Sequence, residues 1–444
     1  MDAREVALFT LNACERQGGW SDGVLKKQIA AAGLDSRDAG LATQLCFGVI
    51  QNRILLDFYL SKFSNIPLRR LEGKVLQALR LGLYQMLFLT RIPHSAAVDQ
   101  PVDLTRTHCK NPRAPGMVNA ILRNLERSLD RLPTIPEDDP AEYYATLYSH
   151  PSWLVRELLE PLGSEGPAAF LQADNSQPPI TAMVNTVKTD LEGALEALQA
   201  EGVHGEPHPW LKNCLVLSRS GSLEELDAFQ KGLFYVQDPA SRLAVMALDP
   251  EPGSRVLDMC AAPGGKSFAA AIQMKDQGEI WSCDLHPHKK TLIQKGAQRL
   301  GLTCIRPQTA DGKVRRPEWE GGFDRVLVDA PCSGLGVIRK KPDIRFKDPE
   351  PLAGLPQVQS AILDNAAGYV KPGGVLVYST CTILERENRA VTDAFLAAHP
   401  EFSRERFLLP GPAGEVSEGQ ITLWPQVHGT DGFYICKLRK DGEA

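Results

Sequence analysis

The first 130 residues carry apolar side chains at the three-to-four-residue spacing of an α-helix. Residues 117–129 show it best, because one face of that segment holds Val118, Ile121, Leu122, Leu125 and Leu129. Residues 75–89 are apolar on nearly every side, which predicts the central helix of a bundle. We therefore predict an all-helical domain over residues 1–130. A linker is predicted over 131–140, where three prolines and three acids occur together.

A mixed pattern follows the linker. Residues 141–245 alternate helix-like and strand-like segments, which predicts a small α/β segment leading into the last domain. From 246 to 444, short runs of continuous apolar residues alternate with amphipathic helices. Strands of this kind are buried on both faces, so the pattern predicts a mostly parallel, doubly wound sheet. Residues 421–425 and 432–440 close the chain as a predicted hairpin.

Composition excludes several classes of protein. Hydrophobic residues make up 43% of the chain and charged residues 23%, which is typical of a globular protein and not of a disordered one. No segment reaches the roughly 18 apolar residues of a membrane span. The first residues carry acids where a secretory signal needs basic ones, so we expect a cytoplasmic protein. Ten scattered cysteines, with no pair spaced two residues apart, favour free thiols and predict no metal site.

Charge is unevenly distributed along the chain. Residues 1–130 hold 17 basic and 12 acidic residues, a net charge of +5, while the whole chain carries −5. A basic front on an acidic body indicates an anionic partner for the front. A solvated surface would explain a charge of +5 equally well.

A glycine-rich turn over 258–267, with the sequence DMCAAPGGKS, follows a predicted strand and opens a predicted helix. Gly264 and Gly265 allow a ligand to approach the backbone closely. The turn is not a phosphate-binding Walker A loop, because Cys260 occupies the position where that loop requires glycine. An NTPase is therefore disfavoured.

Acidic residues end three successive predicted strands. Asp258 ends the first, Asp284 the second and Asp311 the third. In nucleotide sites, an acid at the second position binds the ribose hydroxyls, and Asp311 could bind an adenine amino group. A nucleoside pocket without a phosphate cradle suits S-adenosylmethionine. The predicted cofactor-binding residues are Cys260, Ala261, Ala262, Pro263, Gly264, Gly265, Lys266, Asp284, Asp311 and Asp329.

Two cysteines follow apolar strands at the same predicted edge of the sheet. Cys332 lies in the segment 329–336, DAPCSGLG, and Cys381 lies in 378–382, YSTCT. A thiolate that adds to carbon 6 of a pyrimidine makes carbon 5 nucleophilic enough to accept a methyl group, which is covalent catalysis. A carboxyl group at N3 assists the addition, and a second cysteine can assist release of the first.

These segments resemble the motifs of the Sun/Fmu family of RNA 5-methylcytosine methyltransferases. The similarity covers about residues 235–440 and rests on DMCAAPGGKS, VLVDAPCSGLGVIRKKPDIRF and VLVYSTCTILEREN. It implies a Rossmann-like class I methyltransferase domain with a seven-stranded sheet. It also implies that Cys381 is the nucleophile, that Cys332 aids release, that Asp329 contacts the target cytosine and that Lys266 lines the site.

The front of the chain resembles the antiterminator NusB over residues 94–127, and NusB-like domains are helical RNA binders. Family members that join such a front to this catalytic domain act on 16S ribosomal RNA, which is the expected partner. We expect a monomer that needs no membrane. The predicted RNA contacts are Arg106, Lys110, Arg113, Arg123 and Arg127 in the front, and Arg339, Lys340, Lys341 and Arg345 beside the active site. A solvated loop is the alternative for the last four.

Two further functions stay open on the sequence. The same chemistry could act on tRNA or another RNA, although the NusB-like front favours ribosomal RNA. A non-catalytic RNA-binding factor for ribosome assembly could use an inactive methyltransferase fold. The presence of both cysteines together with Asp329 argues against that reading.

Overall fold

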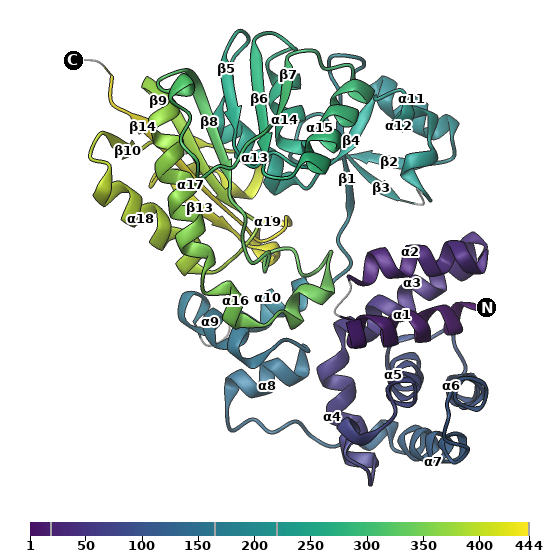
Figure 1. Cartoon of the computed structure of the whole chain (residues 1–444). Coiled ribbons are helices and arrows are strands. Elements are labelled where there is room, and N and C mark those ends of the chain that lie inside the picture. Colours follow the sequence, from purple (N-terminus) through teal and green to yellow (C-terminus); the bar gives the residue numbers. More distant parts are fainter. Residues whose placement is uncertain (18–19, 164–165, 219–220, 443–444) are drawn as a thin grey trace. The chain divides into compact units, whose positions relative to one another are not determined.

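The computed structural model describes residues 1–444 except 18–19, 164–165, 219–220 and 443–444 (Figure 1). The chain divides into two compact units. The first comprises residues 1–176 together with 340–347, and the second comprises 177–339 and 348–444. This division falls inside the segment 141–245 that we predicted as one α/β piece. None of the helices among the described residues is long and apolar enough to span a membrane.

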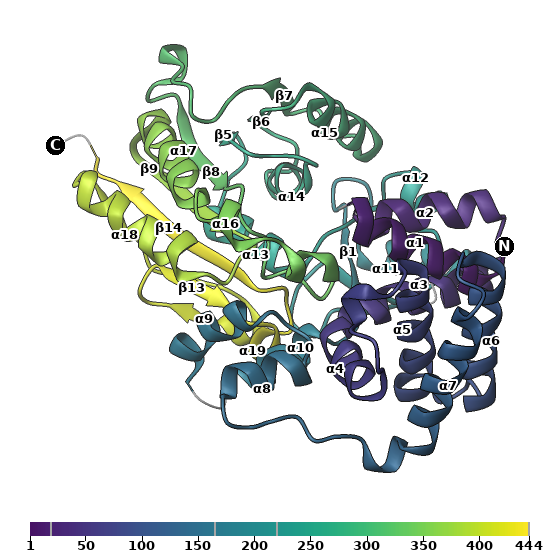
Figure 2. The same ribbon diagram turned by 60° about the horizontal axis from the view of Figure 1, so that its bottom comes forward.

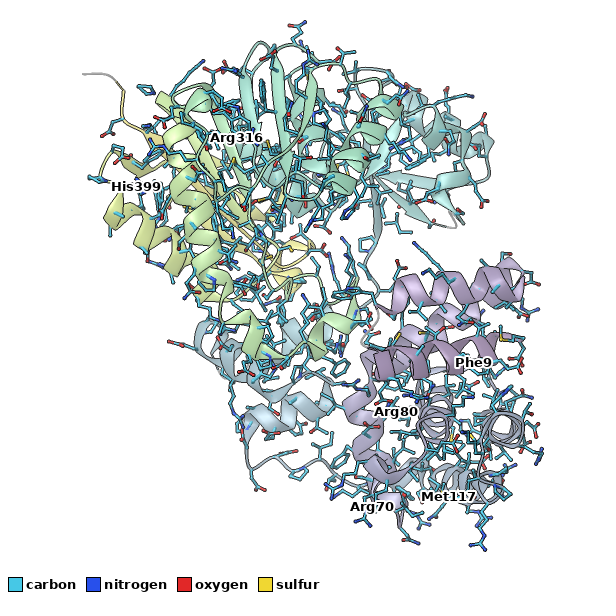
Figure 3. All side chains as sticks on the ribbon, viewed as in Figure 1. Phe9, Arg70, Arg80, Met117, Arg316 and His399 are labelled. Carbon is cyan, nitrogen blue, oxygen red and sulfur yellow. The ribbon has the colours of Figure 1, made fainter. Side chains whose placement is uncertain are left out.

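The first unit is helical, and its residues 1–130 are all-helical as predicted. Its described helices are α1 (Ala3–Gln17), α2 (Ser21–Ala32), α3 (Ser36–Gln51), α4 (Arg53–Phe63), α5 (Gly73–Phe88), α6 (His94–His108), α7 (Ala114–Arg127), α8 (Pro140–Leu147), α9 (Ser152–Leu162) and α10 (Gly166–Asp174). Helix α5 is the central one and packs against α1, α3, α4, α6 and α7. Its buried Arg80, labelled in Figure 3, lies 3.1 Å from a carboxylate oxygen of Glu15 and 2.7 Å from one of Asp57, so its charge is compensated inside the bundle.

A short excursion of the chain, residues 340–347, belongs to this helical unit. The fully buried Arg345 donates hydrogen bonds to the backbone carbonyls of Gln51 and Ser149, at 2.7 and 2.9 Å. It also donates to Oδ1 of Asn175 at 3.0 Å. The prediction that Arg345 contacts RNA is therefore wrong, because its guanidinium group is enclosed by protein acceptors.

The second unit begins with a small antiparallel sheet in the order β2-β3-β1-β4. Its strands are β1 (Ile180–Val184), β2 (His204–Pro207), β3 (Cys214–Ser218) and β4 (Phe234–Val236), and its helices are α11 (Leu191–Ala200) and α12 (Asp227–Gln230). Leu198 of α11 and Phe234 of β4 are buried in the same small core. Strands and helices thus alternate in the later part of residues 141–245, as the mixed pattern predicted.

The large sheet has the strand order β10-β14-β9-β8-β5-β6-β7, with β13 paired to β14. Its strands are β5 (Arg255–Asp258), β6 (Glu279–Asp284), β7 (Ile305–Thr309), β8 (Phe323–Asp329), β9 (Val370–Thr380), β10 (Phe402–Arg404), β13 (Gln420–Leu423) and β14 (Phe433–Lys440). Strands β5 to β9 pair in parallel, which confirms the predicted sheet. The predicted hairpin forms between β13 and β14, and it adds an eighth described strand to the seven expected.

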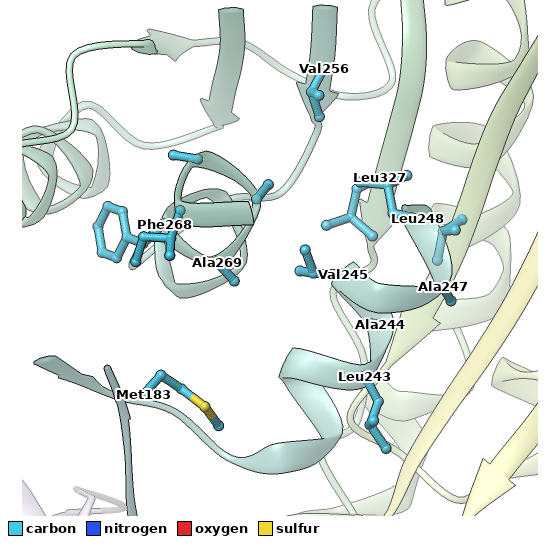
Figure 4. Packing of buried hydrophobic residues seen from close by; sticks show 14 of the residues in the cluster. Met183, Leu243, Ala244, Val245, Ala247, Leu248, Val256, Phe268, Ala269 and Leu327 are labelled. Carbon is cyan, nitrogen blue, oxygen red and sulfur yellow. The ribbon is translucent and has the colours of Figure 1, made fainter. Parts of the chain in front are cut away.

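Helices cover both faces of this sheet. The described helices of this part of the chain are α13 (Pro239–Leu248), α14 (Gly265–Gln273), α15 (Pro287–Leu300), α16 (Pro349–Leu352), α17 (Leu355–Tyr369), α18 (Arg389–Ala398) and α19 (Pro425–His428). Val256 of β5 joins the core formed with α13, α14 and α15, part of which Figure 4 shows. The next residue, Leu257, joins the core under α17 and α18 on the other face (Figure 2). Because both faces are covered, consecutive positions in the middle of these strands are apolar, as in the run 326–328 of β8.

Candidate active site

The glycine-rich turn lies between β5 and α14, at the carboxyl edge of the parallel strands. Gly264 has a φ of +115°, and a Cβ there would lie 2.3 Å from the Phe268 ring, so the turn requires glycine. A cavity of about 210 Å³ opens beside the turn. Its lining includes residues from Cys260 to Pro263, together with Gly265, Lys266, Asp258, Asp329, Asp238 and Ser241.

Asp258 forms part of this cavity wall and is fully buried. Its Oδ2 accepts a hydrogen bond from the Ser267 hydroxyl at 2.7 Å, and Ser282 extends the chain by donating to Ser267 at 2.7 Å. Its Oδ1 has no hydrogen-bond partner among the described residues. Burial raises the pKa of Asp258 to about 7.

The other two strand-end acids lie at neighbouring loops. Asp284 ends β6, where its Oδ1 accepts the His286 backbone N–H at 3.2 Å and lies 3.5 Å from Nζ of Lys289. Asp311 follows β7 and accepts the Lys313 backbone N–H at 3.0 Å. Neither lines the cavity beside the glycine-rich turn. Their roles toward ribose and adenine stay predictions.

The structure brings the two candidate cysteines together. The sulfur atoms of Cys332 and Cys381 lie 3.3 Å apart, within hydrogen-bonding distance for a thiol. Cys381 follows β9 directly, and Cys332 lies in the loop after β8, the neighbouring parallel strand. The two loops also share a backbone hydrogen bond, because the Gly336 N–H donates to the Cys381 carbonyl at 3.0 Å. Parallel pairing of β8 and β9 therefore places both sulfurs at one edge.

An ion pair lies beside the sulfurs. Nζ of Lys266 lies 2.7 Å from Oδ2 of Asp329, and the Ser379 hydroxyl donates to the other oxygen at 2.9 Å. Burial lowers the pKa of Lys266, but the charge of Asp329 outweighs it, so the pKa ends above its usual value. Both oxygens of Asp329 thus hold donors, which keeps this carboxylate fixed at the end of β8.

The two thiols have different electrostatic surroundings. A hydrogen bond from Cys332 lowers the pKa of Cys381, and the Lys266 ammonium acts in the same direction. The same hydrogen bond, together with burial and the charges of Glu387 and Asp329, raises the pKa of Cys332 well above its usual value. Of the two thiols, Cys381 is therefore the one favoured as thiolate.

Arg339 has a structural role in place of the predicted one. Only 5% of its side chain is exposed. Its Nε lies 2.8 Å from Oδ1 of Asp431, and its Nη2 lies 3.5 Å from Oδ2 of Asp238. The prediction that Arg339 contacts RNA is therefore wrong, because the group ties the loop after Cys332 to α13 and β14. Its neighbour Lys341 is exposed, and its predicted RNA contact stays a prediction, as does that of Lys340.

The predicted RNA contacts in the helical unit differ in exposure. Arg106, Lys110, Arg113 and Arg127 are exposed, although Arg106 pairs with a neighbouring aspartate on the same helix. Arg123 is partly buried and lies 2.7 Å from Asp99 and 3.0 Å from Glu126. The four exposed cations remain the better candidates for a polyanion.

Sequence reasoning did not single out Glu387 and Asn388. They lie in a charged stretch, REN, that has the composition of a solvated turn, yet both side chains are buried beside the cysteine loops. The sequence does offer one indication that they lie near the site, because they closely follow Cys381 and the apolar residues Ile383 and Leu384.

Comparison with known proteins defines the class. Residues 245–439 match the family described as 16S rRNA methyltransferase RsmB/F, and residues 1–127 match the NusB family. Residues 150–224 match the ferredoxin-like domain of RsmF/B-like methyltransferases. Fold and site thus define an RNA methyltransferase that carries a NusB-like helical domain, and the predicted fold class is confirmed.

Full-length relatives identify the family more narrowly. The probable ribosomal RNA small subunit methyltransferase B of Bacillus subtilis (strain 168) is 40% identical over 446 residues, 99% of each chain. Its counterpart in Klebsiella pneumoniae (strain MGH 78578) is 34% identical over 413 residues, 92% of this chain and 91% of that one. The chain belongs to the ribosomal RNA small subunit methyltransferase B family.

Solved structures share the fold. The crystal structure of PH0851 has a TM-score of 0.80 and 26% identity, and covers 99% of each chain. A methyltransferase homolog from Pyrococcus horikoshii has a TM-score of 0.57 and 26% identity, over 67% of this chain and 97% of its own.

Proposed function

We propose that this chain methylates carbon 5 of a cytosine in 16S ribosomal RNA, with S-adenosylmethionine as methyl donor and a covalent adduct between Cys381 and carbon 6. The observation that carries the proposal is the 3.3 Å separation of the Cys332 and Cys381 sulfurs beside the Lys266–Asp329 ion pair. Two thiols with different electrostatic surroundings suit a reaction that needs one nucleophile and one proton carrier.

The cavity beside the glycine-rich turn has the character that a nucleoside methyl donor needs. Its wall is free of bulky side chains at Gly265 and Ala261, and it includes Asp258, whose buried Oδ1 has no hydrogen-bond partner among the described residues. In this proposal the turn from Cys260 to Lys266 holds the donor, Asp284 binds its ribose and Asp311 its adenine. When bound, the donor supplies an electrophilic methyl group on a sulfonium sulfur, which keeps the electron pair of the broken bond.

The cysteines perform the covalent steps. The Cys381 thiolate forms a bond to carbon 6, and the π electrons of the carbon 5–carbon 6 bond become available at carbon 5, which then takes the methyl group. In release, the carbon 5 hydrogen passes to the sulfur of Cys332. The electron pair of the broken C–H bond restores the carbon 5–carbon 6 double bond. The bond between Cys381 and carbon 6 breaks at the same time, and its electron pair stays on the Cys381 sulfur. As Cys332 accepts the proton from carbon 5, it passes its own thiol proton to Cys381. Atoms and charges balance, because both sulfurs end as thiols.

The remaining groups orient the base and balance charge. Asp329 faces the base as an acceptor that suits the amino group at carbon 4 of cytosine. Lys266 holds Asp329 in place and stabilises the nearby thiolate. The exposed cations of the helical unit supply contacts to RNA phosphates. The names of the relatives and of the matched family support small-subunit 16S RNA as the substrate.

The proposal is tested by bisulfite sequencing of ribosomal RNA from cells that lack the protein. We expect one cytosine of 16S RNA to lose its protection from conversion, and the purified protein with S-adenosylmethionine to restore it on naked 16S RNA. Restoration on tRNA alone would assign a different RNA. RNA binding without methyl transfer to any RNA would support a non-catalytic assembly factor and refute the proposal.

A further inference from the structure

Two consecutive side chains, Glu387 and Asn388, lie between the loops of the two cysteines. Glu387 ends a 3₁₀ turn (Glu385–Glu387), and Asn388 precedes α18. Both side chains are buried, with 0% and 1% of their surface exposed. A buried carboxylate is costly unless it is hydrogen-bonded, so its contacts indicate what it is held there to do.

Glu387 fixes the loop of Cys332. Its Oε2 accepts the backbone N–H of Ser333 at 2.9 Å, and it also accepts Nε2 of Gln359 at 2.9 Å. The same Gln359 nitrogen donates to the Pro331 carbonyl at 3.0 Å. The residue on each side of Cys332 is thus held by the Glu387–Gln359 pair.

Asn388 fixes the loop of Cys381 in the same manner. Its Oδ1 accepts the Thr380 hydroxyl at 2.5 Å, and its Nδ2 donates to the Thr382 carbonyl at 3.0 Å. The hydroxyls of Ser333 and Thr382 lie 2.7 Å apart and join the two loops directly. Neighbouring positions in the sequence therefore hold the residues that flank both cysteines.

We propose that Glu387 and Asn388 are positioning residues that set the Cys332–Cys381 geometry, and that the Glu387 carboxylate keeps Cys332 in its thiol form so that Cys381 is the thiol that ionises. The inference rests on the proposed covalent function. It assigns the difference in ionisation between the two thiols to Glu387, a residue that does not itself react.

The charged groups around each sulfur favour this division. Cys332 faces two carboxylates, Glu387 and Asp329, in addition to Cys381. Cys381 also faces Asp329 and Asp431, but the Lys266 ammonium is among its charged neighbours and favours its thiolate. Oε1 of Glu387 has no hydrogen-bond partner among the described residues, so part of its charge is uncompensated inside the site. An uncompensated negative charge disfavours a second one on Cys332.

The charge effect is tested by alkylation with iodoacetamide over a pH series, with each cysteine read out separately by peptide mass spectrometry. In the wild-type protein we expect Cys381 to react at lower pH than Cys332. In Glu387→Gln, which keeps the shape and removes the charge, the midpoint for Cys332 should fall below the wild-type midpoint. Glu385→Gln is the matched control, because Glu385 is exposed on the same turn. It should leave both midpoints unchanged.

An unchanged Cys332 midpoint in folded Glu387→Gln, with its circular dichroism intact, would overturn the assignment of charge. If that variant does not fold, the wild-type order still decides, because Cys332 reacting at lower pH than Cys381 contradicts the proposal. Alkylation requires neither RNA nor methyl donor, so its outcome is separable from that of the bisulfite experiment.

The proposed role of Asn388 in setting the distance between the two sulfurs is tested with a bifunctional thiol reagent that bridges only adjacent sulfurs. Asn388→Ala should lower the yield of the Cys332–Cys381 bridge severalfold relative to the wild type. Arg389→Ala is the control, since Arg389 is the exposed next residue, and it should bridge as the wild type does. Equal bridging in Asn388→Ala and the wild type would refute the role of Asn388.

Discussion

Replacement of Arg345 by Met distinguishes a buried structural group from an RNA contact. The guanidinium group makes three hydrogen bonds, at 2.7, 2.9 and 3.0 Å, and is fully buried. Its removal leaves three buried acceptors without a donor. An unsatisfied buried acceptor costs about 1 to 3 kcal/mol, and we take the lower value of about 1 kcal/mol for each. The unfolding free energy of the helical unit should therefore fall by about 3 kcal/mol. Methionine fills most of the aliphatic volume, which limits any cavity contribution.

The assay is hydrogen exchange as a function of urea, read by mass spectrometry on peptides of α3, α4 and α9. With a urea dependence of about 2 to 3 kcal/mol per molar, 3 kcal/mol corresponds to a midpoint lowered by about 1 to 1.5 M. Lys341→Met is the matched control, because Lys341 is exposed in the same segment and loses the same charge. Its midpoint should equal that of the wild type. RNA affinity is measured in parallel at several salt concentrations.

The reasoning is refuted if Arg345→Met unfolds at the wild-type urea concentration. It is refuted equally if that variant keeps its stability while the salt dependence of RNA binding falls by about one phosphate contact, since this is the signature of a backbone-contacting cation.

Three further predictions concern the catalytic unit. Cys381→Ala should form no RNA adduct, whereas Cys332→Ala should accumulate an adduct that survives denaturing electrophoresis, and the reverse pattern would exchange the two roles. Asp284→Ala should weaken S-adenosylmethionine binding by about 1.5 to 3 kcal/mol for each of two lost charged hydrogen bonds, measured by calorimetry, and unchanged affinity in a folded variant would remove Asp284 from the site. Because burial raises the pKa of Asp258 to about 7, the folded state holds a proton there that the unfolded state releases above about 4, so this residue's contribution makes stability fall as pH rises from about 4 to 7. Asp258→Asn should remove that loss of stability, which amounts to up to about 4 kcal/mol at pH 8. The check is thermal unfolding at pH 5 and pH 8, where the midpoint temperature should change less with pH in the variant than in the wild type.

Much of the catalytic site could be predicted because it depends on local order along the chain. Cys332 and Cys381 each follow a strand with a short apolar run, residues 326–328 and 375–377, and parallel strands present their carboxyl ends at one edge, so two separate motifs meet. The glycine-rich turn was predictable for a similar reason. Gly264 adopts a positive φ that other residues rarely adopt, so a glycine after a strand indicates a turn of this kind.

The roles of the arginines were not predictable in this way. Arg339 and Arg345 stand in a basic run that has the composition of a phosphate-binding loop. Their true partners are the carboxylates Asp238 and Asp431 for the first and backbone carbonyls of Gln51 and Ser149 for the second. Every residue has a backbone carbonyl, so the residue type does not show which carbonyl accepts a hydrogen bond. All of these partners are also about 90 to 300 positions away in the sequence, so only the fold identifies them.

The excursion of residues 340–347 into the helical unit affects how the protein is made. The chain passes between the two units at three points, after residues 176, 339 and 347. The ribosome therefore completes the first 176 residues well before it supplies Arg345, and at about 5 to 20 residues per second the delay is on the order of ten to thirty seconds. During that interval the carbonyls of Gln51 and Ser149 lack their native donor, and the nascent bundle matures only once most of the catalytic domain has been synthesised. A genetic cut after residue 176 would leave a bundle without its last segment, and a cut after 339 or 347 would divide the second unit between two polypeptides, so no single cut yields two complete units.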